Sequence, residues 1–297
     1  MILHDDHGKG KKGPSYAGGL VLEPKKGLYD KYILLLDFNS LYPSIIQEYN
    51  ICFTTVERSS SDGFVPHLPS SKTTGVLPEL LKNLVQRRRM VKSWMKNASG
   101  LKVQQLDIQQ QALKLTAKGR EILRSTVDLV QNNLNLEVIY GDTDSIMIYS
   151  GLDDISKAKA IAGKVIQEVN KKYKCLEIDL DGLYKRMLLL KKKKYAAVKV
   201  QFKDGTSYEV IERKGLDMVR RDWSLLSKEV GDFCLSQILS ERSCEDVVES
   251  IHSSLMKVQE DMRNGQVALE KYVITKSLTK PPEAYPDAKT NRMFKWH

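Results

Sequence analysis

The sequence predicts an α+β fold built on an antiparallel sheet, with helices on the sheet and at the C-terminal end. Short, nearly continuous apolar runs separated by turn residues indicate strands in the middle of the chain. Longer segments whose apolar residues recur every three to four positions indicate helices, and beyond Gly215 the helical period dominates. No apolar run approaches the roughly 18 residues that a membrane span needs, so we expect no membrane contact.

The composition is that of a folded protein with excess positive charge. The chain has 297 residues, of which 41% are hydrophobic, which suffices for a core and, at this length, for about two domains. Lys and Arg number 47 against 37 Asp and Glu, a formal net charge of +10. The four cysteines lie far apart without a C-x-x-C pair, which disfavours a zinc site or a disulfide framework.

The first expected elements follow from local patterns. Residues 1–30 contain several glycines and lysines and are expected to be a flexible lead-in. The apolar run Tyr32–Asp37 predicts a buried strand, and Pro43, in a first helical turn, favours a helix over Leu41–Tyr49. A stretch rich in Ser, Thr, Gly and Pro over residues 59–74 predicts a loop.

The next two segments predict a helical hairpin with a basic stripe. Leu77–Met95 and Val103–Leu123 both follow the helical period, and Ser99–Gly100 breaks the pattern between them. The remaining chain predicts a strand–turn–strand hairpin, a helix, three further strands and two C-terminal helices. In chain order these are Leu136–Tyr140, Ser145–Tyr149, Ile155–Tyr173, Met187–Leu190, Tyr195–Val200, Ser207–Ile211, Val219–Leu239 and Cys244–Asn264.

The positive charge is concentrated in two segments. Residues 82–124 hold eleven Lys and Arg against two acids, and residues 185–221 hold twelve against four. Two basic segments separated by an acidic one indicate the walls of a groove for a polyanion such as nucleic acid. The alternative is that each segment is only a solvated helix or strand face.

Three aspartates could carry metal chemistry. Asp37 ends the predicted buried strand, and Asp142 and Asp144 lie in the hairpin turn, where an extended backbone would point both to one face. Mg²⁺ prefers one or two carboxylates together with substrate phosphates, and polymerases are among the enzymes that use two such ions. The alternative is that each aspartate is only a local hydrogen-bond acceptor.

At these residues the chain resembles the family B DNA polymerases. Five segments in the family's order carry the resemblance, and together they are much more specific than any one of them. They are YAGG (16–19), DFNSLYPSII (37–46), YGDTDS (140–145), LLKKKKYAA (189–197) and KGLDMVRRDW (214–223). The continuation QEYNICFTTVER (47–58) is similar to the family's alpha branch.

The resemblance implies roles for individual residues. Asp37 and Asp144 are the expected metal-binding carboxylates, with Asp142 as an acidic neighbour. The expected nucleotide-binding residues are Ser40, Leu41, Tyr42, Arg88, Lys92 and Lys114, where Tyr42 would exclude a ribose 2′-hydroxyl. The residues expected to contact primer and template are Lys191, Lys192, Lys193, Lys194, Tyr195, Lys214, Arg220 and Arg221.

The resemblance also implies an architecture and an activity. A polymerase palm over 31–78 and 124–213 would carry shortened helical-hairpin fingers over 79–123 and a truncated, mostly helical thumb over 214–297. The activity is that of a DNA-directed DNA polymerase, a nucleotidyltransferase that uses two Mg²⁺ ions. The implied partners are a dNTP, primer–template DNA or RNA–DNA, primase and accessory replication subunits, and the implied location is the nucleus.

One motif departs from the family pattern. After Lys114 the family continues with Asn-Ser-x-Tyr-Gly, whereas this chain passes from Ala117 directly to KGREIL (118–123), which resembles a segment well downstream. We therefore expect strongly impaired activity, and the alternative function is a catalytically dead DNA- or nucleotide-binding fragment. A two-metal nuclease is a third reading, which no further motif favours.

Overall fold

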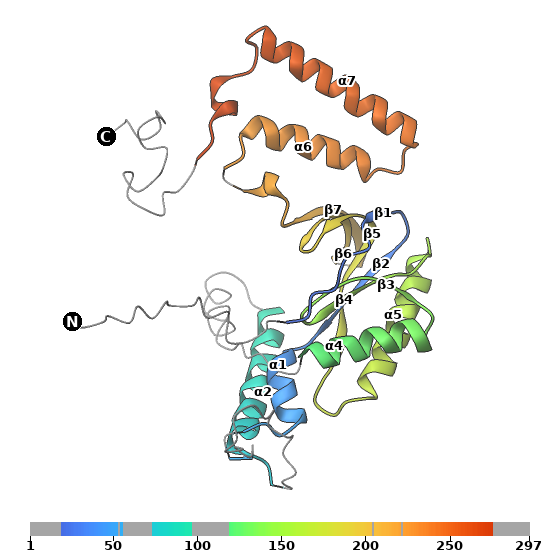
Figure 1. Ribbon diagram of the computed structural model, residues 1–297, viewed down its shortest axis with the longest axis vertical. Coiled ribbons are helices and arrows are strands. Elements are labelled where there is room, and N and C mark those ends of the chain that lie inside the picture. Colours follow the sequence, from blue (N-terminus) through green and yellow to red (C-terminus); the bar gives the residue numbers. More distant parts are fainter. Residues whose placement is uncertain are drawn as a thin grey trace, which may run out of the picture. The chain divides into compact units, whose positions relative to one another are not determined.

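The computed structural model describes residues 19–52, 54–55, 73–96, 119–203, 205–220 and 222–275. Within them the fold is α+β, as predicted, with six α-helices and a seven-stranded antiparallel sheet (Figure 1). The strand order is β3-β4-β2-β5-β6-β7, and β1 (Gly27–Tyr29) also pairs with β5. The chain divides into two compact units, residues 1–185 and 186–297, with the division inside β5 (Ile178–Lys191).

The first unit is organised around β2 (Ile33–Phe38), which pairs with β4 (Ser145–Tyr149) and with β5. The apolar run of β2 forms a strand because neighbouring strands flank it on both sides, and Ile33, Leu34 and Leu36 are fully buried. β3 (Glu137–Asp142) pairs with β4 on the far side, so the predicted hairpin is confirmed. The sheet therefore fixes the strand ends that carry the acidic residues.

Among the described residues, four α-helices complete this unit. α1 (Leu41–Glu48) follows β2 at once and packs against α2 (Val76–Lys96), while α4 (Gly119–Asp128) and α5 (Ile155–Asn170) contact the sheet (Figure 1). α4 continues into a single π-helical turn over Leu129–Asn133. α5 begins at Asp154, whose carboxylate accepts hydrogen bonds from the backbone N–H groups of Ser156 and Lys157.

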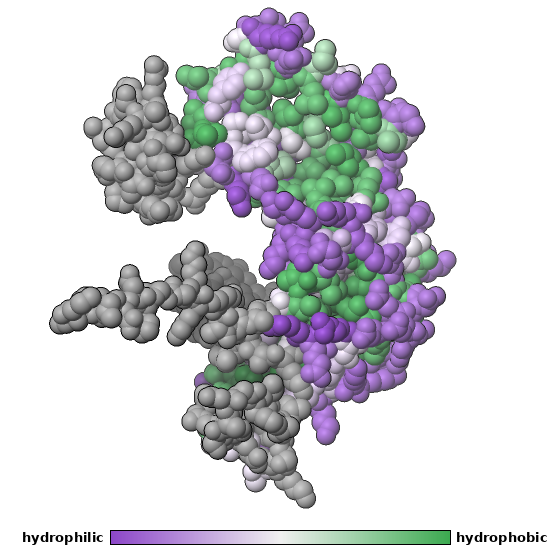
Figure 2. All heavy atoms as spheres, viewed as in Figure 1, coloured by the Kyte–Doolittle hydropathy of each residue, from purple (hydrophilic) through white to green (hydrophobic). Residues whose placement is uncertain are grey.

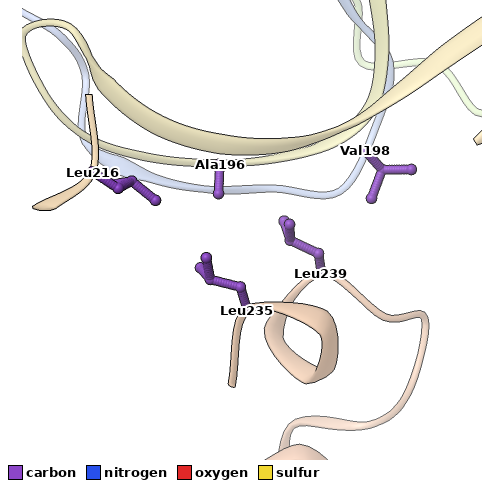
Figure 3. Packing of buried hydrophobic residues seen from close by; sticks show 5 residues of the cluster. All are labelled: Ala196, Val198, Leu216, Leu235 and Leu239. Atoms are coloured by element: carbon purple, nitrogen blue, oxygen red, sulfur yellow. The ribbon is translucent and has the colours of Figure 1, made fainter. Parts of the chain in front are cut away.

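The second unit joins a strand hairpin to two helices. β6 (Lys194–Lys203) and β7 (Thr206–Lys214) pair along their whole length, and α6 (Leu225–Ile238) packs against α7 (Cys244–Arg263). The unit's core places side chains of β6 against α6 and the residue that follows it (Figure 3). The cluster comprises Ala196, Val198, Leu216, Leu235 and Leu239.

Several predicted boundaries are wrong for physical reasons. Residues 19–30 are not a flexible lead-in, because Val21 bridges to Asp142 and β1 joins the sheet. β5 begins at Ile178, far before the predicted Met187, because its first half pairs with β2 despite its charged residues and a glycine. α4 extends beyond the predicted end at Leu123.

Near the C-terminal helices the predictions are mixed. α6 begins at Leu225 and not at Val219, because Ser224 caps it and a short 3₁₀ turn over Asp217–Val219 precedes it. α7 agrees with its predicted range to within one residue. The predicted loop over 59–74 and the first part of the second hairpin helix fall mostly outside the described residues. Among the helices that the structure describes, none is long and apolar enough to cross a membrane.

Candidate active site

The carboxylates of the site lie at one end of three neighbouring strands. Asp37 of β2 and Asp142 of β3 both lie opposite Ser145, the first residue of β4, and Asp144 immediately precedes it. The backbone N–H of Phe38 donates to the carbonyl oxygen of Asp144 over 2.8 Å. Because adjacent strands are spaced at about 4.8 Å, main-chain pairing alone brings the three aspartates into one neighbourhood.

The turn between the two aspartates is tight and not extended. Thr143 has a left-handed φ of 60°, and the N–H of Asp144 donates to the carbonyl oxygen of Asp142 over 2.6 Å. The backbone between the two aspartates is therefore not the extended one from which the sequence placed both carboxylates on one face. The Thr143 hydroxyl donates to Oδ1 of Asp142 over 3.0 Å and orients that carboxylate.

The segment before β1 supports this turn, a role that the sequence analysis did not assign. The Thr143 N–H donates to the Leu20 carbonyl oxygen over 2.8 Å. A Cβ on Gly19 would lie 2.6 Å from the Thr143 hydroxyl oxygen, closer than a side chain can approach. Only glycine fits there, and its place in the YAGG motif was the available signal.

Ser40, Leu41 and Tyr42 form the start of α1, one residue beyond the end of β2. Ser40 adopts a left-handed φ of 52° at the N-terminal cap, and Leu41 is buried. Tyr42 is partly buried, and its ring lies against Gly119 of α4, where a Cβ would come within 3.1 Å of the ring. Burial, and next the carboxylate of Asp144, raise the pKa of the Tyr42 phenol above its usual value. The Tyr42 phenol therefore lies close enough to Asp144 for the charge of that carboxylate to affect its pKa.

A cation from α2 approaches the same place. Nη1 of Arg88 donates to the Ser40 hydroxyl oxygen over 2.8 Å. Its Nε is buried and makes no hydrogen bond within the described part of the chain. A buried guanidinium N–H with no acceptor is costly, and an anion that reached this atom would offset the cost.

Two predicted nucleotide-binding residues are described only in part or lie outside the described residues. Lys92 belongs to α2, but only its backbone is described, and Lys114 lies outside the described residues. The structure thus brings together the three aspartates, Ser40, Leu41, Tyr42 and Arg88.

The predicted DNA-contacting residues gather mostly in the second unit. Lys191, Lys192 and Lys193 are exposed around the β5–β6 turn. Lys194 binds the Asp217 carboxylate over 2.7 Å, and this bond lowers the pKa of Asp217 below its usual value. Tyr195 is buried, and its hydroxyl donates to Glu212 over 3.2 Å. The remaining predicted contacts are Lys214 and Arg220, which are exposed, and Arg221, which lies outside the described residues.

The donor set of the acidic end suits a hard cation that is shared with a substrate. No group of three or more His, Cys, Asp or Glu that could hold a metal occurs within the residues described. Mg²⁺, however, is commonly held by one or two carboxylates while phosphate oxygens and water supply the other ligands. Asp37 and Asp144 fit that requirement by chemistry and by strand pairing.

The chain is similar to DNA polymerase alpha catalytic subunits over nearly its whole length. It is 76% identical over 311 residues to a DNA polymerase alpha catalytic subunit of Oryza sativa subsp. japonica, covering 96% of this chain and 20% of that protein. The corresponding protein of Arabidopsis thaliana is 68% identical, covering 98% and 21%, and that of Mus musculus is 48% identical, covering 95% and 22%. The chain therefore spans about a fifth of the length of these relatives.

The alignments also locate the departure from the family pattern. Since 96% of 297 residues is about 285, about 26 of the 311 positions aligned with the Oryza sativa protein have no residue in this chain. The sequence model "DNA polymerase family B" matches in two parts, residues 1–118 and 115–295, which overlap at residues 115–118, where the chain departs from the family pattern. These two matches cover almost all of the sequence, and the chain belongs to DNA polymerase family B, a family of nucleotidyltransferases.

Proposed function

We propose that this chain is the catalytic portion of a polymerase of the alpha type, which transfers deoxynucleotides to a primer 3′ end under the direction of a template. One observation carries the proposal: strand pairing brings Asp37 next to the Asp142–Asp144 turn, and the Ser40–Tyr42 segment begins three residues after Asp37. On this proposal residues 31–78 and 124–213 are the palm, 79–123 the fingers and 214–297 the thumb. The partners would be primer–template DNA or RNA–DNA, with primase and accessory subunits in the nucleus.

The chain's residues have distinct tasks in this reaction. Asp37 and Asp144 would hold two Mg²⁺ ions, which lower the pKa of the primer hydroxyl and neutralise charge on the departing pyrophosphate. Asp142 is held by Thr143 and adds negative charge beside them. The carboxylates therefore fix where the reacting phosphate must lie.

The nucleotide would be positioned by α1 and α2. The left-handed turn at Ser40 leaves the first N–H groups of α1 able to face a triphosphate, as helix N-termini commonly do. Arg88 presents its unpaired Nε beside Ser40 and would compensate charge that develops on the phosphates. Tyr42 would occupy the space that a ribose 2′-hydroxyl requires.

The exposed lysines around the β5–β6 turn would bind the phosphate backbone. Such contacts position nucleic acid without reading its sequence, and their strength falls as salt rises. Tyr195 and Lys194, which bond to Glu212 and Asp217, would hold the hairpin in shape for these contacts.

A second candidate function is DNA binding without catalysis. The observation that favours it is that about 26 aligned positions of the Oryza sativa relative have no residue in this chain, and that the family match breaks at residues 115–118, where the Asn-Ser-x-Tyr-Gly element is expected to follow. Misplacing a nucleotide by about 1 Å can reduce a rate by about 10²-fold.

Nucleotide-dependent DNA binding distinguishes the two functions. A fluorescent primer–template whose primer ends in a dideoxynucleotide is titrated with the chain, with Mg²⁺ and either the matching or a mismatched dNTP. The polymerase proposal expects tighter binding with the matching dNTP alone. A binding fragment would show the same salt-sensitive affinity in all cases, and this result would overturn the proposal.

A further inference from the structure

The N-terminal end of α2 is held by a compact group of side chains that follow α1. These are Asn50, Cys52 and Thr55, which we call the α2 clamp. None of them belongs to the acidic end of the sheet or to the β5–β6 turn with its exposed lysines. Their bonds converge on Thr73, Gly75 and Leu77, at the start of the helix that carries Arg88.

Asn50 makes the first part of the clamp. Its side-chain Nδ2 donates to the Thr73 carbonyl oxygen over 2.9 Å, and its Oδ1 accepts from the Gly75 N–H over 2.8 Å. Asn50 has a left-handed φ of 51°, which asparagine tolerates better than most residues. One amide therefore fixes two backbone groups just before α2 begins.

Cys52 satisfies a donor that the helix itself leaves unpaired. The first N–H groups of an α-helix have no partner within the helix, and here Pro78 removes one of them. The N–H of Leu77 donates to the Sγ of Cys52 over 3.3 Å, and the Thr54 hydroxyl donates to the same sulfur over 3.1 Å. Cys52 is only 4% exposed, so its sulfur acts as a buried cap supplied by another segment.

Thr55 locks these groups together. Its hydroxyl donates to the Asn50 carbonyl oxygen over 2.6 Å and accepts from the Cys52 N–H over 2.9 Å. Gly75 packs so closely that an added Cβ would lie 2.6 Å from the Cys52 Cβ and 3.0 Å from the Thr55 Cγ2. The start of α2 consequently has little freedom to shift relative to the clamp.

The clamp and Arg88 tie α2 to opposite ends of α1. Asn50 lies two residues after α1 ends, whereas Ser40, which accepts from Arg88, caps its beginning. Twelve residues separate Val76 from Arg88, about 18 Å along a helix. α1 and α2 pack together between these two contacts. If the clamp were lost, α2 would be held less firmly against α1, and Arg88 would move away from Ser40.

We propose that the α2 clamp positions Arg88 against Ser40 and thereby sets the affinity for the incoming dNTP. The inference rests on the proposed function, because it assigns Arg88 to the triphosphate. Asn50, Cys52 and Thr55 are positioning residues that touch neither nucleotide nor metal. The clamp also gives a physical reason for the NICFTT stretch (50–55) that follows the acidic strand and α1.

The test uses the full chain with Asn50→Ala, which removes both amide bonds, and with Cys52→Ala. Cys52→Ser is the conservative rescue because a hydroxyl can still accept from Leu77. Asn83→Ala is the matched control, since Asn83 is an exposed residue of the same helix. Amide hydrogen exchange at Gly75 and Leu77 reports on the clamp. The affinity for dATP is measured from the tightening of binding to a dideoxy-terminated primer–template with a templating thymine.

We expect exchange at Gly75 and Leu77 to accelerate at least about tenfold in Asn50→Ala, with a loss of dATP affinity of about three- to tenfold. Cys52→Ala should show the same pattern, whereas Cys52→Ser and Asn83→Ala should remain near the wild type. Unchanged exchange in Asn50→Ala, or faster exchange with unchanged dATP affinity, would overturn the inference. If the wild type itself shows no tightening of binding with dATP, the proposed function and this inference both fail. The missing wild-type signal distinguishes this outcome from a failure of the inference alone.

Discussion

The strands that carry the aspartates and the helix that carries Arg88 are held by different kinds of interaction. Asp37 and Asp142 sit on backbone that is paired in register with Ser145, and Asp144 lies in the turn just before it, where its carbonyl oxygen accepts from the Phe38 N–H. Ile33, Leu34 and Leu36 of the same sheet are fully buried. Arg88 lies on a helix that also packs on α1 but is anchored by individual side-chain bonds, at its N-terminal end and through Arg88 itself. Backbone pairing tolerates most substitutions, whereas a side-chain anchor is lost with one.

This difference predicts which substitutions abolish catalysis and which only weaken nucleotide binding. Changes at the acidic end should remove chemistry and leave the fold intact, because the carboxylates contribute little to the pairing of the strands. Changes on or near α2 should alter nucleotide affinity by graded amounts.

The largest effect is expected for Asp37→Asn. Loss of one metal-binding carboxylate should reduce primer extension by at least about 10³-fold, because the charge that holds the cation is removed. Primer–template binding should stay within a factor of about two, because phosphate contacts lie elsewhere. Rates of single-nucleotide extension check this, with Asp181→Asn as an exposed control on β5. Equal losses in both variants would contradict the assignment.

Arg88→Ala should act on nucleotide binding. Removing a guanidinium beside the triphosphate should weaken dNTP affinity by about 10- to 100-fold, since charge-assisted hydrogen bonds are among the strong ones. Arg87→Ala is the control, because Arg87 is exposed and adjacent on the same helix. The concentration dependence of extension gives the affinity of each. If both arginines behave alike, α2 contributes only general positive charge.

Tyr42→Val should change sugar selection. With the ring gone, incorporation of rNTP relative to dNTP should rise by about 10- to 100-fold, whereas Tyr42→Phe should keep the wild-type preference because it keeps the ring. Competition between dATP and ATP on one template measures the ratio. An rNTP preference in Tyr42→Phe as strong as in Tyr42→Val would show that the hydroxyl, and not the ring, excludes the ribose.

The double substitution of Lys192 and Lys193 by Ala should change salt dependence. Each lost phosphate contact should reduce the slope of log affinity against log salt by about 0.9. The slope for the double variant should therefore fall by about two, and the slope for Lys164→Ala, an exposed control on α5, should not change. Binding titrations at several salt concentrations provide the slopes. An unchanged slope would remove the β5–β6 turn from the DNA interface.

The smallest effect concerns the pH dependence of stability through Cys52. Hydrogen bonds from Thr54 and from the start of α2 lower the pKa of this thiol from 9.0 to about 7 in the folded chain. Since the folded state favours the thiolate, its contribution to stability is complete above pH 9 and is lost as pH falls through about 7. Urea midpoints between pH 6.5 and 9.5 should rise less steeply for Cys52→Ser than for the wild type. Parallel curves would show that the sulfur does not titrate as the contacts imply.

The sequence predicted most of the first unit because its elements are locally encoded. The apolar run of β2, the Gly-Asp-Thr-Asp turn and the periodic α2 carry their structure in neighbouring residues. The first half of β5 could not be found this way, since Asp179, Asp181 and Gly182 are poor strand formers and only pairing with β2 makes them a strand. The prediction of a flexible lead-in was wrong for the same reason, because Val21 bridges to Asp142, a residue more than a hundred positions away in the sequence.

The candidate site shows the same distinction between residues found from local motifs and contacts between distant segments. The aspartates and Tyr42 could be named from motifs, and strand register explains why they meet. The support of Thr143 by Gly19 and the caps of α2 by Asn50 and Cys52 depend on contacts between segments, which no local pattern reveals. Sequence therefore identified the groups that would do the chemistry, and the structure shows what holds them.

The central claim is that the acidic end of the sheet is a working catalytic centre. The most direct test is extension of a labelled primer–template by one nucleotide with Mg²⁺, comparing the chain with its Asp144→Asn variant at equal, measured DNA occupancy. We predict slow extension by the chain, limited by the absence of the Asn-Ser-x-Tyr-Gly element after Ala117, and no extension by the variant. Absence of extension from both proteins, with salt-sensitive DNA binding retained, would contradict the claim and leave a DNA-binding fragment.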